Sequence, residues 1–227
     1  KNLEPIFIIG LPRSGSTVVE AILSSGKKKI LSLGETSLIN WSVITTPKKT
    51  MSSLNSRLIC SKLENALSNL GVSSVKNNTF TEKSLENFFY IEIILKIFPK
   101  AKFINTTRNT IDNILAIFQQ FLSKISWSHS LEDILEYTNN YLTIIKFFKK
   151  KYPNKIFSIK LEELTSNREE ITKNIYKFCR LEWDKKALEF YKRKDLFTTT
   201  ASNLQIRNGL HDYDENKYKS YQYLLKS

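Results

Sequence analysis

Histidine and cysteine are scarce in this chain, with two of each among 227 residues. Cys60 and Cys179 form no C-x-x-C pair, and neither histidine belongs to a cluster with the spacing of zinc ligands. We therefore predict no metal site, and we expect free thiols in a reducing compartment as the default.

Long apolar runs are also missing. No segment approaches the roughly 20 residues that a membrane-spanning helix needs, and no secretory signal opens the chain, which begins at Lys1 rather than Met. We expect no membrane segment in this chain, and we expect the chain to be one part of a longer protein.

Acidic residues are outnumbered, because 22 Asp and Glu stand against 35 Lys and Arg, for a net charge of +13. Two explanations stay open. One is a lysine-rich proteome, which the many Asn and Ile residues favour; the other is an anionic ligand or acceptor, which summed positive charge attracts. Nucleic-acid binding is not predicted, since the sequence has no helix-turn-helix, zinc or aromatic RNA-binding pattern.

Short apolar segments alternate with segments of helical periodicity, which predicts parallel βαβ units in an α/β fold with helices on both faces of the sheet. The expected strands are 5–9, 30–33, 80–81, 101–106 and 155–161, and the expected helices begin after Gly15 or cover about 58–70, 86–97, 111–118, 131–150, 169–180 and 184–193. Residues 42–56 have loop chemistry and are expected to be mobile. We expect one domain over 1–227.

The segment PIFIIGLPRSGST, from Pro5 to Thr17, is the most informative one. A buried strand that runs through a glycine-bearing loop into a helix forms a nest of backbone N–H groups, which binds a phosphate. It nearly matches the nucleotide-binding pattern G-x-x-x-x-G-K-[ST], but Ser16 stands where the lysine is expected, and Arg13 lies three residues earlier. An ordinary strand-to-helix turn is the alternative. The missing lysine argues against ATP or GTP hydrolysis.

With Arg13 and without the lysine, Gly10–Thr17 resembles the 5′-phosphosulfate loop of sulfotransferases that use 3′-phosphoadenosine-5′-phosphosulfate (PAPS). It is most similar to the loop of tyrosylprotein sulfotransferases and of bacterial sulfotransferases linked to tetratricopeptide repeats. The resemblance implies a P-loop NTPase-like three-layer sandwich with a central, mainly parallel sheet. It also implies that the 5′-phosphosulfate is bound by Arg13, Ser14, Gly15, Ser16 and Thr17.

Two later segments resemble the family's catalytic motifs. Leu33-Gly34-Glu35-Thr36 is similar to the segment that carries the general base, so the resemblance implies that Glu35 takes the proton of the acceptor hydroxyl. The segment TEKSLENF, residues 81–88, resembles D-K-x-P-x-N-F and implies that Lys83 stabilises the leaving oxygen. A carboxylate at a helix N-terminus and a solvated lysine are the structural alternatives.

The donor's 3′-phosphate is implied to lie at Arg108, because residues 98–112 resemble the family's strand–turn–helix for that group. Ala116 stands where the family has a serine. Losing that hydroxyl donor should weaken binding by about 1–2 kcal/mol unless a neighbour compensates. Leu161 likewise replaces a usual tyrosine in the segment Lys160–Leu164.

The C-terminal segment resembles the family in two places. The stretch 200–207 (TASNLQIR) implies that Ser202 contributes near the sulfuryl group. Lys217 and Tyr218 occupy the positions of the family's K/R-W pair, which implies contacts to the 3′-phosphate or the adenine.

These features together predict a sulfotransferase that moves a sulfuryl group from PAPS to a hydroxyl of a peptide tyrosine, a carbohydrate or a small molecule, with no metal. Glu35, Lys83, Arg13 and Ser202 are the expected catalytic residues. The alternatives are a nucleotide or small-molecule kinase with a divergent loop, and a non-catalytic nucleotide-binding module. We expect residues 42–58 and the turn at 120–130 to shape an acceptor cleft, and an acidic acceptor would suit the basic chain. A bacterial cytoplasm is the expected location, or the Golgi lumen if an N-terminal anchor precedes Lys1.

Overall fold

Five parallel strands form the sheet, in the order β2-β3-β1-β4-β5. The computed structural model describes residues 3–28, 30–47, 56–73 and 78–193, with Tyr213, Asp214, Asn216, Lys219 and Tyr221. The strands are β1 (Ile6–Gly10), β2 (Leu31–Ser32), β3 (Phe80–Glu82), β4 (Lys102–Thr107) and β5 (Ile156–Lys160). All five predicted strands are confirmed, and so is the parallel α/β sheet with helices around it.

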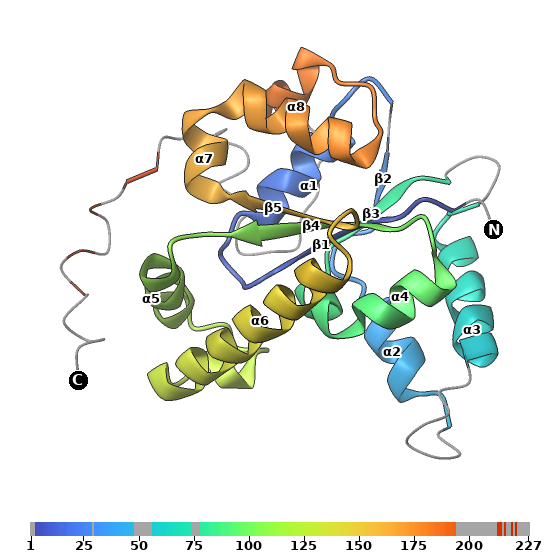
Figure 1. The fold of residues 1–227 in the computed structure, drawn as a ribbon, viewed down its shortest axis with the longest axis horizontal. Helices are drawn as coiled ribbons and strands as arrows, with labels where there is room; N and C mark the ends of the chain where they lie inside the picture. Colours follow the sequence, from blue (N-terminus) through green and yellow to red (C-terminus); the bar gives the residue numbers. More distant parts are fainter. Residues whose placement is uncertain are drawn as a thin grey trace.

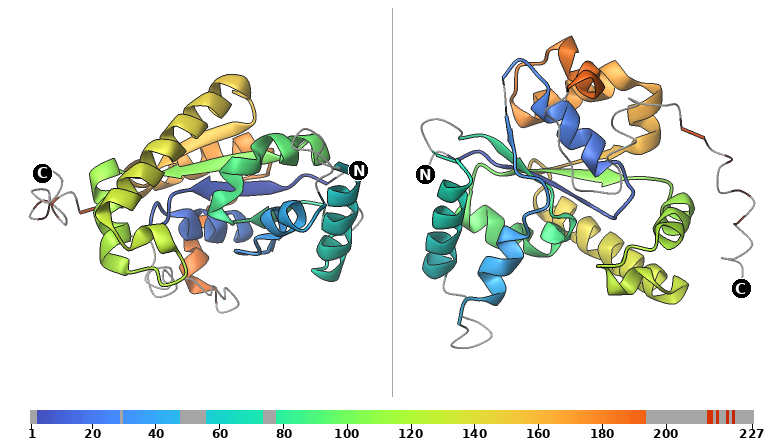
Figure 2. Two further views of the ribbon diagram at one scale, coloured as in Figure 1. Left: turned by 90° about the horizontal axis from the view of Figure 1, so that it is seen from below. Right: turned by 180° about the vertical axis from the view of Figure 1, so that it is seen from behind.

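Helices cover both faces of the sheet, which gives three layers (Figures 1 and 2). One face carries α1 (Ser16–Ser24), α7 (Leu161–Ser166), α8 (Arg168–Cys179) and the 3₁₀ segment η3 (Lys185–Lys192). The other carries α2 (Leu38–Ile44), α3 (Ser56–Asn69), the 3₁₀ segment η1 (Leu85–Tyr90), α4 (Ile91–Ile97), α5 (Thr110–Gln120) and α6 (Leu131–Lys151). A short 3₁₀ turn, η2 (Ser126–Ser128), links α5 to α6.

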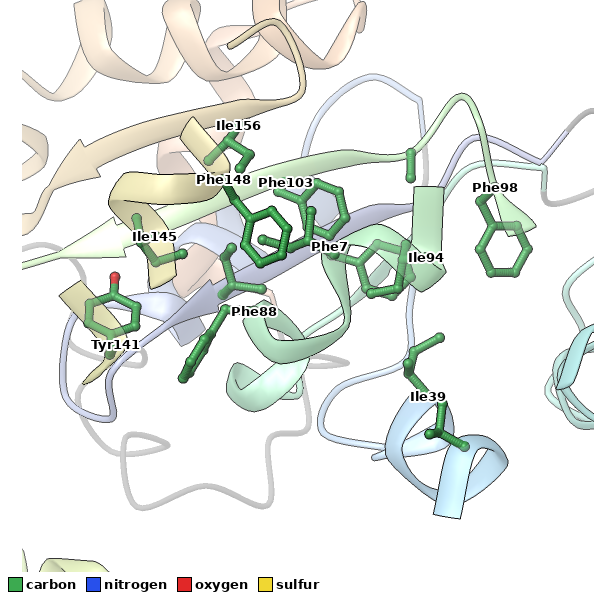
Figure 3. Packing of buried hydrophobic residues seen from close by; sticks show 14 of the residues in the cluster. Phe7, Ile39, Phe88, Ile94, Phe98, Phe103, Tyr141, Ile145, Phe148 and Ile156 are labelled. Carbon is green, nitrogen blue, oxygen red and sulfur yellow. The ribbon is translucent and has the colours of Figure 1, made fainter. Parts of the chain in front are cut away.

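The two hydrophobic cores follow from the alternation of side chains along each strand. In β1, Phe7 and Ile9 enter the core under α3, α4 and α6, whereas Ile6 and Ile8 enter the core under α1 and α8. Phe7 stacks on Phe103 of β4, with ring centroids 5.5 Å apart (Figure 3). Because both faces of the central strand β1 are buried, this strand is apolar from Ile6 to Ile9, as the sequence shows.

Several helices differ from the sequence predictions. The helix expected over 86–97 is a 3₁₀ segment followed by α4, and the helix expected over 184–193 is the 3₁₀ segment η3, with a kink at Glu189. Residues 42–44, expected in a loop, belong to α2, because Ile39 and Val43 pack into the core. Residues 48–55 of that expected mobile loop lie outside the described residues.

Other sequence expectations concern thiols, membrane and metal. Cys60 and Cys179 are both free, as predicted. Within the described ranges, no helix combines the length and apolar character needed to cross a membrane. Among the same residues, no three His, Cys, Asp or Glu side chains gather as a metal site would require.

Candidate active site

The polar residues singled out from the sequence follow the carboxyl ends of the strands. The loop after β1 starts at Gly10, Glu35 follows β2, Lys83 directly follows β3, and Arg108 directly follows β4. Because the strands are parallel, these ends share one edge of the sheet, where ligands bind in open α/β folds.

The loop after β1 is held by hydrogen bonds from its own residues and from β4 and α5. The Ser14 hydroxyl donates to the Leu11 carbonyl at 2.6 Å and also shares a hydrogen bond of 2.7 Å with Thr106 Oγ1. Asn113 of α5 donates from Nδ2 to the Pro12 carbonyl at 2.7 Å. A buried side chain therefore anchors the loop at each of these points, so the hydroxyl of Ser14 serves the loop, and only its amide is left for the predicted anion.

Glycine is required at both ends of this loop. Gly10 has φ +149°, and a Cβ there would lie 2.5 Å from the Thr106 carbonyl oxygen. Gly15 has φ +95°, and a Cβ there would lie 2.8 Å from Cδ1 of Leu161. Leu161, where the family usually has a tyrosine, thus packs directly against the loop.

The helix α1 begins right after this loop, and no side chain caps it. Ser16 and Thr17 lie buried in its first turn, and Arg13 precedes them with a left-handed backbone, φ 66°. Helix N-termini carry a partial positive charge and unpaired N–H groups. The start of α1, with Arg13 beside it in the chain, is therefore chemically suited to hold a phosphate or sulfate.

Glu35 and Lys83 form an ion pair although 48 positions separate them. Lys83 Nζ lies 2.6 Å from Glu35 Oε1; the lysine side chain is 1% exposed and the glutamate side chain is 45% exposed. The backbone supports the pair, since Lys83 N–H donates to the Gly34 carbonyl at 2.8 Å. A buried cation thus faces a solvent-accessible carboxylate at the carboxyl edge of the sheet.

Two buried carboxylates lie beneath the turn that carries Glu35. Glu20 of α1 accepts from the Gly34 N–H at 3.3 Å, and Glu82 of β3 accepts from the Thr36 hydroxyl at 2.8 Å. Burial raises the pKa of the Glu82 carboxyl, and hydrogen bonds from Ser84 and Thr36 oppose that shift. The motif D-K-x-P-x-N-F, in which Glu82 stands at the position of the aspartate, did not indicate this support.

A cleft of about 460 Å³ opens beside Glu35 and Pro12. Its far wall includes Trp127, which stacks on Tyr137 with ring centroids 3.9 Å apart. Burial, and then the nearby charge of Glu86, raises the pKa of Tyr137 to about 12, so this phenol is neutral at physiological pH. The turn expected to shape the cleft does so through residues 124–127, whereas on the other side Ser37 and Asn40 line it rather than residues 42–47.

Arg108 lines a second cleft, of about 780 Å³, together with Lys160 and Glu162. Tyr213 also reaches it: Arg108 Nε donates to the Tyr213 hydroxyl at 3.2 Å, and that hydroxyl donates to Asp112. No sequence pattern indicated Tyr213. Ala116, which replaces the family's serine, is buried in α5.

The three C-terminal candidates, Ser202, Lys217 and Tyr218, lie outside the described residues. For the other candidates, the structure joins Lys83 to Glu35 and places Arg108 on another cleft. The loop after β1 reaches the cleft at Glu35 through Gly10 and Pro12, whereas the predicted anion-binding residues 13–17 do not line it. Their roles stay predictions.

A model of the sulfotransferase family matches residues 5–185. The chain belongs to the sulfotransferase family. A protein of Aquifex aeolicus (strain VF5), described as uncharacterized, is 29% identical over 238 residues, which cover 97% of this chain and 31% of that protein. The chain thus spans about a third of that relative's length.

Solved sulfotransferases share the fold. The sulfotransferase domain of the Synechococcus PCC 7002 olefin synthase aligns with a TM-score of 0.69 at 16% identity, covering 97% of this chain and 89% of that domain. The sulfotransferase domain of the curacin biosynthetic pathway aligns with a TM-score of 0.68 at 15% identity, covering 95% and 90%. Mouse sulfotransferase SULT7A1, solved in complex with PAP, gives 0.58 at 13% identity, covering 100% and 84%.

Proposed function

We propose that this chain transfers the sulfuryl group of PAPS to an acceptor hydroxyl and releases adenosine 3′,5′-bisphosphate (PAP). The observation that carries the proposal is the pair formed by Lys83 Nζ and Glu35 Oε1, 2.6 Å apart, with Glu35 on the same cleft as the loop after β1. Membership of the sulfotransferase family supports it, and so does the fold shared with a sulfotransferase solved with PAP.

Each residue has one task in the proposed reaction. Glu35 accepts the proton of the acceptor hydroxyl while the hydroxyl oxygen attacks the sulfur atom. The bond between that sulfur and the bridging oxygen of the 5′-phosphate breaks, and its electron pair stays on the bridging oxygen. Lys83 and Arg13 stabilise the negative charge on the leaving group and on the transferring sulfuryl group, and Ser202 assists nearby.

Binding of the donor PAPS involves two groups of residues, one for each end of the molecule that carries a phosphate. The start of α1, with Ser14, Gly15, Ser16 and Thr17, holds the 5′-phosphosulfate, and Arg108 holds the 3′-phosphate with help from Lys217 and Tyr218. Arg108 suits this task because it follows the strand next to β1, at the same edge of the sheet as the phosphate loop. Ala116 offers no hydroxyl for that phosphate, whereas Tyr213 places one on Arg108 itself.

We propose that the acceptor occupies the cleft between Glu35 and Trp127. A volume of about 460 Å³ is in the range of small-molecule sites. Of the described residues that line it, Glu35 and Glu86 are acidic and Lys124 is basic. With two acidic residues and one basic residue, these walls do not favour the acidic acceptor that was expected from the net charge. We therefore propose a hydroxyl acceptor without negative charge close to the reacting oxygen.

Transfer of ³⁵S from labelled PAPS to a mixture of phenols, sugars and peptides tests the proposed function. Glu35→Ala should abolish transfer, whereas the control Glu92→Ala should not, because Glu92 pairs with Lys151 outside both clefts. Thermal stabilisation by ATP with Mg²⁺ but not by PAP would instead support the kinase alternative. PAP binding with no transfer to any acceptor would support the non-catalytic module.

A further inference from the structure

We propose that Glu82 is a positioning residue, whose buried carboxylate fixes the turn that presents Glu35 against the strand end that presents Lys83. This inference rests on the proposed function for its kinetic consequences. The way in which Glu82 holds Glu35 and Lys83 relative to one another does not depend on that function.

The Glu82 side chain is 2% exposed and accepts hydrogen bonds from both segments of the site. From the turn, Oε1 accepts the Thr36 N–H at 3.3 Å and the Thr36 hydroxyl at 2.8 Å. From the other side, Oε2 accepts the Ser84 N–H at 3.2 Å, and the Ser84 hydroxyl and Asn87 Nδ2 also donate to the carboxylate. Thr36 directly follows Glu35, and Ser84 directly follows Lys83, so one carboxylate ties together the neighbours of both residues.

The turn needs this restraint because its backbone is unusual. Gly34 has φ 67° and Ser37 has φ 49°, so left-handed residues lie on both sides of Glu35. A left-handed conformation is unfavourable for a residue with a Cβ and persists only when surrounding contacts enforce it. The Ser84 hydroxyl supplies such a contact for Ser37, because it accepts the Ser37 N–H at 2.7 Å while it donates to Glu82.

Glutamine cannot replace this carboxylate. Two of its donors are backbone N–H groups, Thr36 N–H on Oε1 and Ser84 N–H on Oε2, and a backbone N–H cannot act as an acceptor. An amide has one oxygen, so Glu82→Gln leaves at least one buried N–H facing another N–H, and the turn must shift. Aspartate keeps both oxygens on a shorter stem.

The kinetic test compares Glu82→Gln and Glu82→Asp with the control Tyr141→Phe. Tyr141→Phe also removes a buried hydrogen bond, to Asn105 Oδ1 at 2.6 Å, but it leaves the turn intact. We expect Glu82→Gln to lower kcat for ³⁵S transfer about 10- to 100-fold, since misplaced catalytic groups cost rate on this scale. The Kd for PAP should change less than about twofold, because Glu82 is neither part of the loop after β1 nor a residue that lines the Arg108 cleft. Glu82→Asp should recover part of the loss, and Tyr141→Phe should keep wild-type kcat.

A second measurement needs no turnover. A double-mutant cycle of Glu35→Gln and Lys83→Met measures how strongly the two residues are coupled in the equilibrium constant for unfolding. We expect a coupling of about tenfold with Glu82 in place and of about twofold or less with the substitution Glu82→Gln. If transfer is absent in the wild type but this coupling collapses, the proposed function fails and the positioning role stands. An unchanged coupling, or a kcat loss that Tyr141→Phe matches at equal loss of thermal stability, overturns the positioning role. If Glu82→Gln does not fold, Thr36→Val, which removes one donor, takes its place in both measurements.

Discussion

The ion pair between Glu35 and Lys83 predicts an asymmetric response to mutation. Glu35→Gln removes the charge that compensates a lysine of 1% exposure, whereas Lys83→Met frees a carboxylate that is already 45% exposed. Breaking a buried pair by removing one partner costs about 3–5 kcal/mol. Water reaches this pair from the glutamate side, and glutamine still offers an acceptor oxygen, so we expect a loss of about 2 kcal/mol for Glu35→Gln.

Lys83→Met should cost less than about 1 kcal/mol, because water solvates the freed carboxylate and the methionine fills the buried space. With a urea m-value of about 2–3 kcal/mol/M, Glu35→Gln then lowers the unfolding midpoint by about 0.7–1 M. The double mutant should be no less stable than Glu35→Gln alone. Urea denaturation at pH 7, followed by circular dichroism, measures all three variants. If Lys83→Met proves as destabilising as Glu35→Gln, the difference in exposure does not set the cost of removing each partner, and the reasoning is refuted.

Three further predictions concern the loop, the donor and the thiols. Gly10→Ala should lower the free energy of unfolding by more than about 3 kcal/mol, because its Cβ would sit 2.5 Å from a backbone oxygen; a thermal midpoint near that of the wild type would contradict this. Arg108→Met should weaken PAP binding at least tenfold while adenosine 5′-phosphosulfate binds unchanged, as calorimetry can measure; equal losses for both ligands would place Arg108 elsewhere. Cys60 should react with a thiol reagent in the native protein, whereas Cys179, buried and with its pKa raised to about 12, should react only after unfolding; early labelling of both thiols would show that the α8 core opens.

Local patterns in the sequence were sufficient for the main elements of the fold. The apolar run of β1, the two glycines and the stripe of α1 are consecutive in the chain, so their order alone predicted a strand, an anion-binding loop and a helix. The helix end at Gly71, with φ 79°, was predicted for the same local reason. The predictions were weaker where tertiary packing overrides local preference, as in η1, whose residues Asn87 and Phe88 are buried.

The sequence by itself determined the alternation of strands and helices, and with it the edge where charged residues collect, because parallel strands end on one side of a sheet. The resemblance of local segments to sulfotransferase motifs also singled out Glu35, Lys83 and Arg108. Only the tertiary structure decided that Lys83 bonds to Glu35, that Glu82 holds both of their neighbours, and that Trp127 and Tyr137 close the far side of the cleft. Those contacts join residues far apart in the chain, and the pairing of β2 with β3 and the packing of α6 on η1, rather than any local pattern, bring them together.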